Sequence, residues 1–483
     1  MNYKMMGKFI GKILMVEAVF MVPAMLISLW EREFAAVIAF MWSLGAILVA
    51  AGGLLWFCRS SQKKFYAKEG LACVGLSWIA MSLLGCLPFF LSGVMPNYID
   101  ALFEIVSGFT TTGASVLPAV EDVPRGILYW RSFSHWLGGM GVLVFLLAVM
   151  PMGKGKNSLL HVMRAESPGP QVDKLVPKLQ DSAKILYAIY IGLTLLQIVL
   201  LLLGGMPLFD SLTTAFGTAG TGGFGIKADS LMGYSHYLQG VCTVFMALFG
   251  VNFSIFYLLL LRQFMKVLKN QELLLYLGIM LGSILIIAFD ILPQYVNIGE
   301  ALHQAAFQVS SIMTTTGFAT ADFNSWPALS KTLLVLLMFV GACAGSTGGG
   351  VKVARVLLLM KAGRRNVKRM LRPRSVSQVH MDGGTVSEEV VQNTYSYLAL
   401  YMGIMVLSVF LIALDEFSLE TNATAVVACL NNIGPGLDMV GPMGSYANFS
   451  WHSKLVLSFD MLAGRLELFP MIMLFVPLSW KRT

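Results

Sequence analysis

The 483-residue chain contains few charged residues: only 12% of its residues are Asp, Glu, Lys or Arg, whereas 57% are hydrophobic. A soluble domain usually carries about a quarter charged residues, so this composition excludes an ordinary soluble protein and indicates a polytopic membrane protein. The net charge is +8, but the basic residues flank the apolar stretches instead of forming one patch. We therefore expect contact with membrane lipid and not with nucleic acid.

The sequence also lacks the motifs of the common alternative classes. Its six cysteines are scattered within or beside apolar stretches, which favours simple packing over disulfides or a metal cluster. Neither His-Glu-x-x-His nor Gly-x-Ser-x-Gly occurs, so we do not expect an enzyme. A Walker loop is absent, as is a Rossmann fingerprint between a strand and a helix, and we expect no organic cofactor in this chain.

Apolar stretches of about 20 residues predict ten membrane spans. They lie near residues 8–30, 35–57, 70–92, 126–150, 183–204, 238–262, 272–292, 331–360, 393–414 and 453–480. Most of the 34 lysines and arginines fall on one side if alternate connections are assigned to the cytoplasm, beginning with the N-terminus. By the positive-inside rule, both termini are predicted to be cytoplasmic.

Four short polar segments between these spans resemble one another, and all four lie on the predicted outer side. This pattern indicates a fourfold repeat of span, re-entrant loop and span. Irregular backbone at membrane depth is tolerated only where it lines a water-filled cavity, so four such loops around one axis predict a cation pathway. The segments are Thr110, Thr111, Thr112 and Gly113; Gly220, Thr221, Gly222 and Gly223; Thr314, Thr315, Thr316 and Gly317; and Asn431, Asn432, Ile433 and Gly434.

The composition of these four filter segments suits the chemistry. A cation that sheds its water needs a ring of oxygens, which backbone carbonyls supply, and glycine permits the dihedrals that turn a carbonyl inward. Threonine and glycine are also common helix-packing residues in membranes, so one segment alone could be a packing feature. Four segments at matching positions favour a pore, although the fourth has no threonine.

An acidic residue precedes each filter segment by about one short helix. Asp100, Asp210, Glu300 and Glu420 occupy these positions. An acid near a helix N-terminus is stabilising, so we interpret the four carboxylates as helix-capping groups, with direct attraction of ions as the alternative. The opposite, partially negative ends of the four helices would then meet at the pore axis.

These loops, together with Gly-Ala-Cys-Ala-Gly-Ser-Thr-Gly-Gly-Gly-Val-Lys at 341–352 and Gly-Arg-Leu-Glu-Leu-Phe-Pro at 464–470, resemble the TrkH/TrkG and KtrB potassium-uptake superfamily. The resemblance covers essentially the whole chain, and an additional N-terminal hairpin favours the TrkH-like branch. It implies potassium selectivity, with sodium as a secondary permeant ion, and a homodimer with one pore per subunit in the cell inner membrane. The filter glycines of the four repeats would be Gly113, Gly223, Gly317 and Gly434.

The resemblance also implies the fold. We expect an all-α polytopic membrane protein with an accessory two-helix hairpin and four channel-like repeats around a pseudo-fourfold pore. Each repeat would contain an outer helix, a pore helix with its filter loop, and an inner helix. The predicted units are residues 1–69 for the hairpin, 70–180 and 181–270 for the first two repeats, 271–385 for a third repeat with a broken inner helix and a basic cytoplasmic loop, and 386–483 for the fourth.

Residues 341–352, here called the glycine loop, interrupt the eighth span. Each glycine costs a helix about 1 kcal/mol, so the helix should open into a loop inside the membrane. Close helix packing is the alternative use of such glycines, whereas the resemblance implies a gate beneath the filter. The predicted gate residues in this loop are Gly341, Gly345, Ser346, Thr347, Gly348, Gly349, Gly350 and Lys352.

Arg465 lies well inside the last apolar span. A charge there costs at least about 2.5 kcal/mol if it is uncompensated, so we expect it to face water, an acid or carbonyl groups. Asp460 and Glu467 are candidate partners, and a buried structural ion pair is one interpretation. The resemblance favours another, in which Arg465 is a cationic barrier to potassium that movement of the glycine loop relieves.

The basic segment 361–374 follows the glycine loop. Such a run can be a topology signal or a contact with lipid headgroups. The resemblance suggests instead a contact with a TrkA-like cytosolic ring that binds NAD or ATP and controls the gate. A proton- or sodium-coupled potassium symporter remains the alternative function, although four repeats of one orientation favour a channel-like pore over the inverted repeats of coupled transporters.

Overall fold

The computed structural model describes residues 3–59, 67–117, 119–139, 141, 179–372 and 378–480. Regular structure in these parts is helical apart from one two-stranded sheet. The α-helices are α1 (Tyr3–Trp30), α2 (Phe34–Phe57), α3 (Ala67–Gly85), α4 (Leu87–Leu91), α5 (Tyr98–Phe109), α6 (Arg125–Gly139), α9 (Leu179–Leu203), α10 (Leu208–Gly220), α11 (His236–Phe249), α12 (Phe253–Leu260), α13 (Phe264–Leu268), α14 (Gln271–Ile291), α15 (Ile298–Met313), α16 (Ala328–Val340), α17 (Val353–Leu371), α18 (Glu388–Ile412), α19 (Leu419–Leu430), α20 (Trp451–Arg465), α21 (Phe469–Phe475) and α22 (Pro477–Trp480). Short 3₁₀ helices are η1 (Leu292–Gln294), η2 (Phe323–Ser325), η3 (Ala413–Asp415) and η4 (Asp438–Val440), and the strands β1 (Val379–Met381) and β2 (Gly384–Val386) pair antiparallel.

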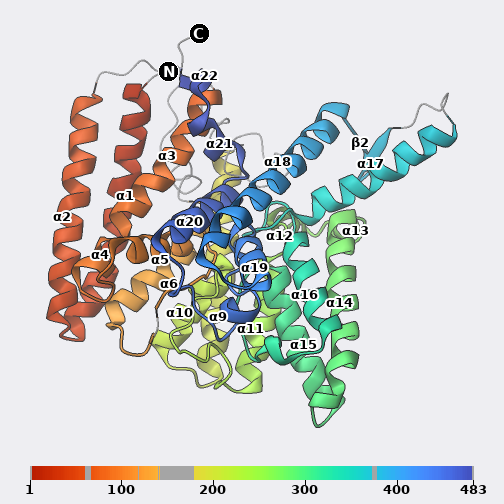
Figure 1. Ribbon diagram of the computed structural model, residues 1–483, viewed down its shortest axis with the longest axis horizontal. Helices are drawn as coiled ribbons and strands as arrows, with labels where there is room; N and C mark the ends of the chain where they lie inside the picture. The colour runs from red at the N-terminus through yellow and green to blue at the C-terminus, as the bar shows by residue number, and fades with distance from the viewer. Residues whose placement is uncertain are drawn as a thin grey trace.

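The accessory hairpin consists of α1 and α2, which pack against each other at one side of the molecule (Figure 1). Small buried residues, including Ala36, Ser43 and Ala51, face α1 along one side of α2. The opposite side is apolar and open, with Trp42 70% and Val49 77% exposed. An apolar surface of this kind is the one that lipid covers in a membrane, which agrees with the predicted hairpin.

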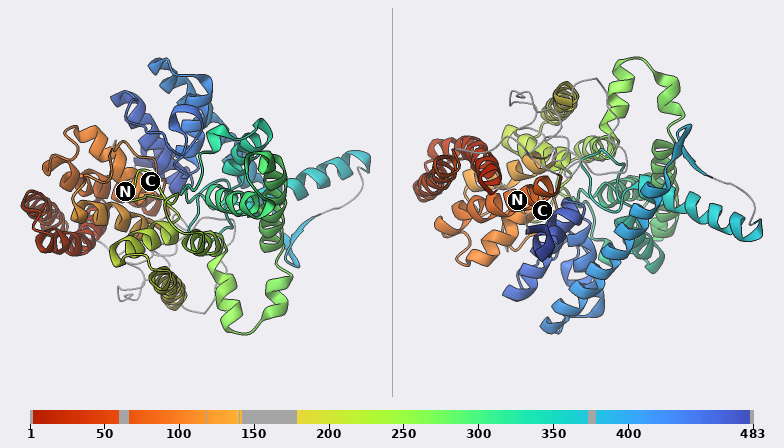
Figure 2. Two further views of the ribbon diagram at one scale, coloured as in Figure 1. Left: turned by 90° about the horizontal axis from the view of Figure 1, so that it is seen from below. Right: turned by 90° about the horizontal axis from the view of Figure 1, so that it is seen from above.

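The four repeats follow one another around a common centre in chain order, and the hairpin lies outside them (Figure 2). Their outer helices are α3, α9, α14 and α18, and their short pore helices are α5, α10, α15 and α19. The inner side of each repeat begins with α6, α11, α16 or α20. The predicted fold class is therefore confirmed, whereas the exact boundaries between repeats stay a prediction because residues 142–178 lie outside the described parts.

The pore helices begin as the capping interpretation predicts. An asparagine or serine side chain caps three of the four by accepting a hydrogen bond from a first-turn backbone N–H, and an acid stands in the first turn of all four. Both features satisfy or stabilise the free N–H groups at a helix start. The caps are Asn97, Asn297 and Ser418, and the acids are Asp100, Asp210, Glu300 and Glu420.

The inner helices are shorter than the sequence predicted. Six helices in the described parts are long and apolar enough to span a membrane, and α11 with α12 passes the same test only as a pair that is bent by 93° at a short break. The spans predicted near 238–262 and 453–480 are interrupted, because α11 ends at Phe249 and α20 at Arg465. The span near 331–360 breaks after Val340, at the glycine loop, as predicted. In the first repeat α6 ends at Gly139, and most of the remaining predicted span lies outside the described residues.

An arm formed by α17, β1 and β2 extends from the third repeat to the start of α18 (Figure 1). Asp382 and Gly383 turn the hairpin with φ values of +49° and +82°, as the tight two-residue turn between β-strands requires. Five apolar residues of α17, the hairpin and α18 pack together, and Arg365 pairs with Glu388 at 2.6 Å. These contacts join the arm to the base of α18.

Candidate functional site

The four filter segments meet in a closed ring. At each filter glycine an added Cβ atom would collide with a carbonyl oxygen of the next repeat, and the fourth glycine meets the first repeat. The four pairs are Gly113 with Gly222, Gly223 with Thr316, Gly317 with Ile433, and Gly434 with Thr112. Side chains are excluded at these positions, so the backbones of all four segments surround one narrow axis.

All four segments share one backbone conformation. The residue two positions before each filter glycine has a φ of 56° to 60°, and the glycine itself again has a positive φ. The residue just before each filter glycine donates its backbone N–H to the carbonyl five residues earlier, at 2.8–2.9 Å. This bond closes each pore helix with a Schellman-type turn. A left-handed residue other than glycine costs roughly 1–2 kcal/mol, so the surrounding packing imposes this shape. The left-handed residues are Thr111, Thr221, Thr315 and Asn432.

The four filter glycines line a cavity of about 180 Å³. Its walls in the described part of the chain contain no carboxylate, but they do include Arg131 and Lys227. The pore helices lead directly into the filter segments, so the partially negative ends of four helix dipoles meet at this centre. A cation in the ring would be stabilised by carbonyls and helix ends alone.

In the fourth filter segment, which has no threonine, asparagine side chains form the hydrogen bonds that support the backbone. In the first and third segments, threonine hydroxyls two residues apart bond each other at 2.8 and 2.7 Å. In the fourth, the Asn432 amide donates to Thr112 Oγ1 at 3.0 Å and to the Met461 carbonyl at 2.9 Å. Asn431 bonds the Tyr401 hydroxyl at 2.8 Å. Asn432 thus connects the fourth segment to the first and to α20.

A buried ion pair supports the first and second segments. Arg131 and Glu104 are 2% and 0% exposed, and Arg131 Nε lies 2.7 Å from Glu104 Oε1. Glu104 also accepts hydrogen bonds from the Ser115 hydroxyl and the Val116 N–H, both at 2.9 Å. Arg131 donates to the Gly225 carbonyl at 2.9 Å. A buried pair with these additional bonds is well compensated, and it fixes the backbone just beyond two filter glycines.

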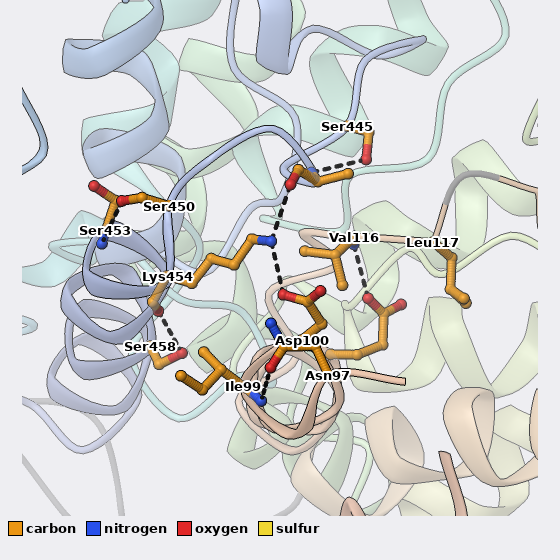
Figure 3. A network of polar contacts seen from close by, with 12 residues as sticks. Asn97, Ile99, Asp100, Val116, Leu117, Ser445, Ser450, Ser453, Lys454 and Ser458 are labelled. Atoms are coloured by element: carbon orange, nitrogen blue, oxygen red, sulfur yellow. Dashed lines mark hydrogen bonds and ion pairs between the residues drawn. The ribbon is translucent and has the colours of Figure 1, made fainter. Parts of the chain in front are cut away.

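A second ion pair connects the last repeat to the first (Figure 3). Lys454, on α20, reaches Asp100 at the start of α5, with 2.7 Å between Nζ and Oδ1. Its ammonium group also donates to the Ala447 carbonyl at 2.9 Å. The acid predicted to cap the first pore helix therefore also holds the inner helix of the fourth repeat, which closes the ring of repeats.

The glycine loop lies against the filter on the side of the pore-helix ends. The Gly349 N–H donates to Thr315 Oγ1 at 2.6 Å. An added Cβ at Gly348 would collide with the Thr314 carbonyl, and one at Gly349 with the Asn431 carbonyl. The loop also bonds the backbone at the break between α11 and α12. It therefore contacts the third and fourth filter segments and interrupts the inner helix as the sequence predicted.

Carbonyl groups surround the Arg465 guanidinium. It donates to the Thr347 carbonyl of the glycine loop at 2.6 Å and to the Gly139 carbonyl at the end of α6 at 2.7 Å. It also bonds the Gly138 carbonyl. Carbonyls are among the environments expected for this charge, and these bonds connect the loop to the fourth and first repeats.

The two acids considered as partners of Arg465 make other contacts. Glu467 forms an ion pair with Arg355 in α17, and Asp460 accepts a 2.7 Å hydrogen bond from a serine of α18. Lys352 donates to the Gly348 carbonyl within the loop. The start of α17 and the end of α20 are thus held together beside the glycine loop.

Comparison with known proteins identifies the family. The model of the TrkH family, described as a cation transport protein, matches residues 39–482. The chain belongs to the TrkH family. It is 35% identical over 450 residues to the Trk system potassium uptake protein TrkH of Salmonella typhimurium, covering 90% of this chain and 91% of that protein. The TrkH protein of Halomonas elongata is 34% identical over 496 aligned positions that cover all of both chains.

A solved structure extends this similarity to three dimensions. The crystal structure of the potassium transporter TrkH from Vibrio parahaemolyticus superposes with a TM-score of 0.89 at 31% identity, covering all of both chains. The resemblance to the TrkH-like branch that the loops suggested is confirmed.

Some features of this TrkH-family site escaped the sequence analysis. The breaks after α11 and α20 were not predicted, although Gly250 and Asn252 at the first break are weak helix formers. At the second break Pro470 is a comparable signal, and it lies just after Glu467 and Leu468, which adopt positive φ values. The pair of Arg131 and Glu104 could have been suspected only from two charges in otherwise apolar surroundings.

Proposed function

We propose that this chain carries potassium into the cell across the inner membrane, through the ring of four filter segments. The closed ring of contacts between each filter glycine and the next segment carries the proposal. Carbonyl groups in such a ring can replace the water of a potassium ion. The names of the relatives, Trk system potassium uptake proteins, support this choice of ion. The sixteen filter residues named from the sequence are the proposed ligands.

The glycine loop and Arg465 form the gate in this proposal. The loop donates a hydrogen bond to Thr315 in the third filter segment and accepts one from Arg465 at the end of α20. Its backbone therefore occupies the space next to the filter. A positive charge at this position raises the barrier to a cation in a region of low dielectric constant. Release of the bond between Arg465 and Thr347 would let the loop move and lower that barrier.

Regulation would come from a separate cytosolic partner, a TrkA-like ring that binds NAD or ATP. The relatives are named as members of a Trk system, which suggests further components. The exposed basic side chains of α17 offer a surface for such a ring, and the helix begins where the glycine loop ends. These residues are Arg364, Lys368 and Arg369 in α17 and Arg372 directly after it. A homodimer with cytoplasmic termini completes the proposed assembly.

Flux measurements on the purified protein in liposomes test the proposal. We expect potassium uptake with a reversal potential that follows the potassium gradient alone. A reversal potential that shifts with an imposed proton or sodium gradient would indicate the coupled symporter instead. Failure to carry potassium, with and without the cytosolic ring, would contradict both functions.

A further inference from the structure

The glycine loop is also held from the side, by the outer helix of its own repeat. Glu272 lies in the first turn of α14 and is 6% exposed. Its Oε1 accepts a 2.6 Å hydrogen bond from the backbone N–H of Ala344 in the loop. Asn270 already caps α14 by accepting a bond from the Leu273 N–H at 2.8 Å. A buried carboxylate is therefore not needed to begin this helix, and it bonds the loop directly.

The arm holds the same turn of α14 from the other side. Asp382, in the turn between β1 and β2, accepts hydrogen bonds from the Gln271 N–H at 2.8 Å and from the Asn270 amide at 3.2 Å. Lys361 of α17 bonds the Gln271 side chain and also the His380 carbonyl, the latter at 2.7 Å. The residues immediately before Glu272 are thus fixed to both parts of the arm.

The glycine loop consequently has two connections to the arm. One is covalent, because α17 starts directly after Lys352. The other runs from the hairpin turn through the start of α14 to Ala344. The apolar cluster between α17, the hairpin and α18 packs the two parts of the arm against each other. Any displacement of the arm relative to α14 must therefore act on the loop from two sides.

We propose that Glu272 is a positioning residue for the gate: its carboxylate keeps the glycine loop against the filter, and Asp382 transmits movements of the arm to it. This inference rests on the gating role proposed above for the loop. It assigns to the start of α14 a part in transport that the filter and Arg465 do not supply.

Potassium flux into liposomes, measured with the full chain, tests the assignment. Glu272→Ala removes the acceptor of the Ala344 N–H, and since a hydrogen bond to a charged group contributes appreciably, basal flux should rise roughly 10- to 100-fold. Glu272→Gln keeps an oxygen acceptor without the charge and should give a smaller rise. Glu389→Ala, at an exposed acid in the first turn of α18, is the matched control and should behave as the unmodified protein.

A double-mutant cycle tests the link to the arm. Asp382 is exposed, so Asp382→Ala should fold even if Glu272→Ala does not, and it should raise basal flux by itself. If both residues act along one path, the double variant should conduct no more than Glu272→Ala. Independent, multiplying effects would overturn the link to the arm, and unchanged or reduced flux in Glu272→Gln and Glu272→Ala would overturn the role of Glu272.

Failure of this inference can be told apart from failure of the gate itself. If Arg465→Ala raises flux while the Glu272 variants do not, only the positioning role is wrong. If neither Arg465→Ala nor the Glu272 variants change the flux of a protein that does carry potassium, the glycine loop is not the gate.

Discussion

Replacement of one filter glycine by alanine offers the most direct test of the ring. Gly113 has a φ of +81°, which costs an alanine roughly 1–2 kcal/mol. Its added Cβ would also collide with the Gly222 carbonyl oxygen. That oxygen must move for the methyl group to fit, so Gly113→Ala should disturb the coordination of an ion as well as the stability of the protein.

Gly93 separates these two effects. Its φ is +78°, nearly the same as that of Gly113, but no atom lies within 4 Å of its added Cβ. Gly93→Ala should therefore lower the free energy of unfolding by roughly the same 1–2 kcal/mol without moving a carbonyl. The difference between the two variants isolates the contribution of the ring.

Selectivity is the quantity to measure. Flux of potassium and of sodium in liposomes measures selectivity, with thermal melting in detergent as the stability measurement. Both variants should lose stability, and Gly113→Ala should lose more than Gly93→Ala because the Gly222 backbone must also shift. Only Gly113→Ala should lose preference for potassium, and each tenfold loss of that preference corresponds to about 1.4 kcal/mol. If Gly113→Ala keeps the ion preference of Gly93→Ala, its carbonyl neighbour is not an ion ligand and the proposed filter is wrong.

Three further predictions concern the gate, the outer loops and the partner. Arg465→Ala removes the bond to the Thr347 carbonyl and the charge, so basal potassium flux should rise by about tenfold or more; unchanged flux, with or without the cytosolic ring, rules the barrier out. Hydrogen bonds from two hydroxyl groups at the start of α19 lower the pKa of Asp438. The stability that this carboxylate contributes is present above the ordinary aspartate pKa of about 3.9 and is lost as the pH falls through its lower folded-state pKa, so Asp438→Asn should show a smaller decrease in melting temperature on acidification; equal decreases would contradict this. Replacing Arg364 and Lys368 by glutamate should weaken binding of a nucleotide-loaded TrkA-like ring in a pull-down, and unchanged retention would place the contact elsewhere.

The shared backbone shape of the four segments could be predicted because its requirements are local. A segment that must turn its carbonyls inward after a short helix needs glycine at one position, and this chain repeats that pattern four times. The fourth segment gives the weakest signal of the four because it has no threonine. Asparagine tolerates the left-handed region better than most residues, so the φ of 56° at Asn432 also has a local explanation.

The ends of the inner helices depend on distant partners instead. Pro470 is a local signal that a helix cannot continue through residue 466, but it does not explain why Glu467 and Leu468 adopt positive φ values. Arg355 from another repeat pairs with Glu467 at this break, and the sequence around residue 467 does not reveal that partner. The arm shows the opposite case, because Asp382 followed by Gly383 is a strong local signal for a β-hairpin.

The ring and the gate differ in symmetry, and this difference has a physical reason. Four equivalent segments are required to surround an ion evenly, and each of the four has the same helix end and the same left-handed residue. Obstruction of the axis needs only one element. The glycine loop of the third repeat contacts the third and fourth segments, and Arg465 of the fourth repeat joins it to the end of α6 in the first. One loop is therefore bonded to several repeats at once, and in the gating proposal a single displacement of that loop would change access to the filter without a matching change in the other three repeats.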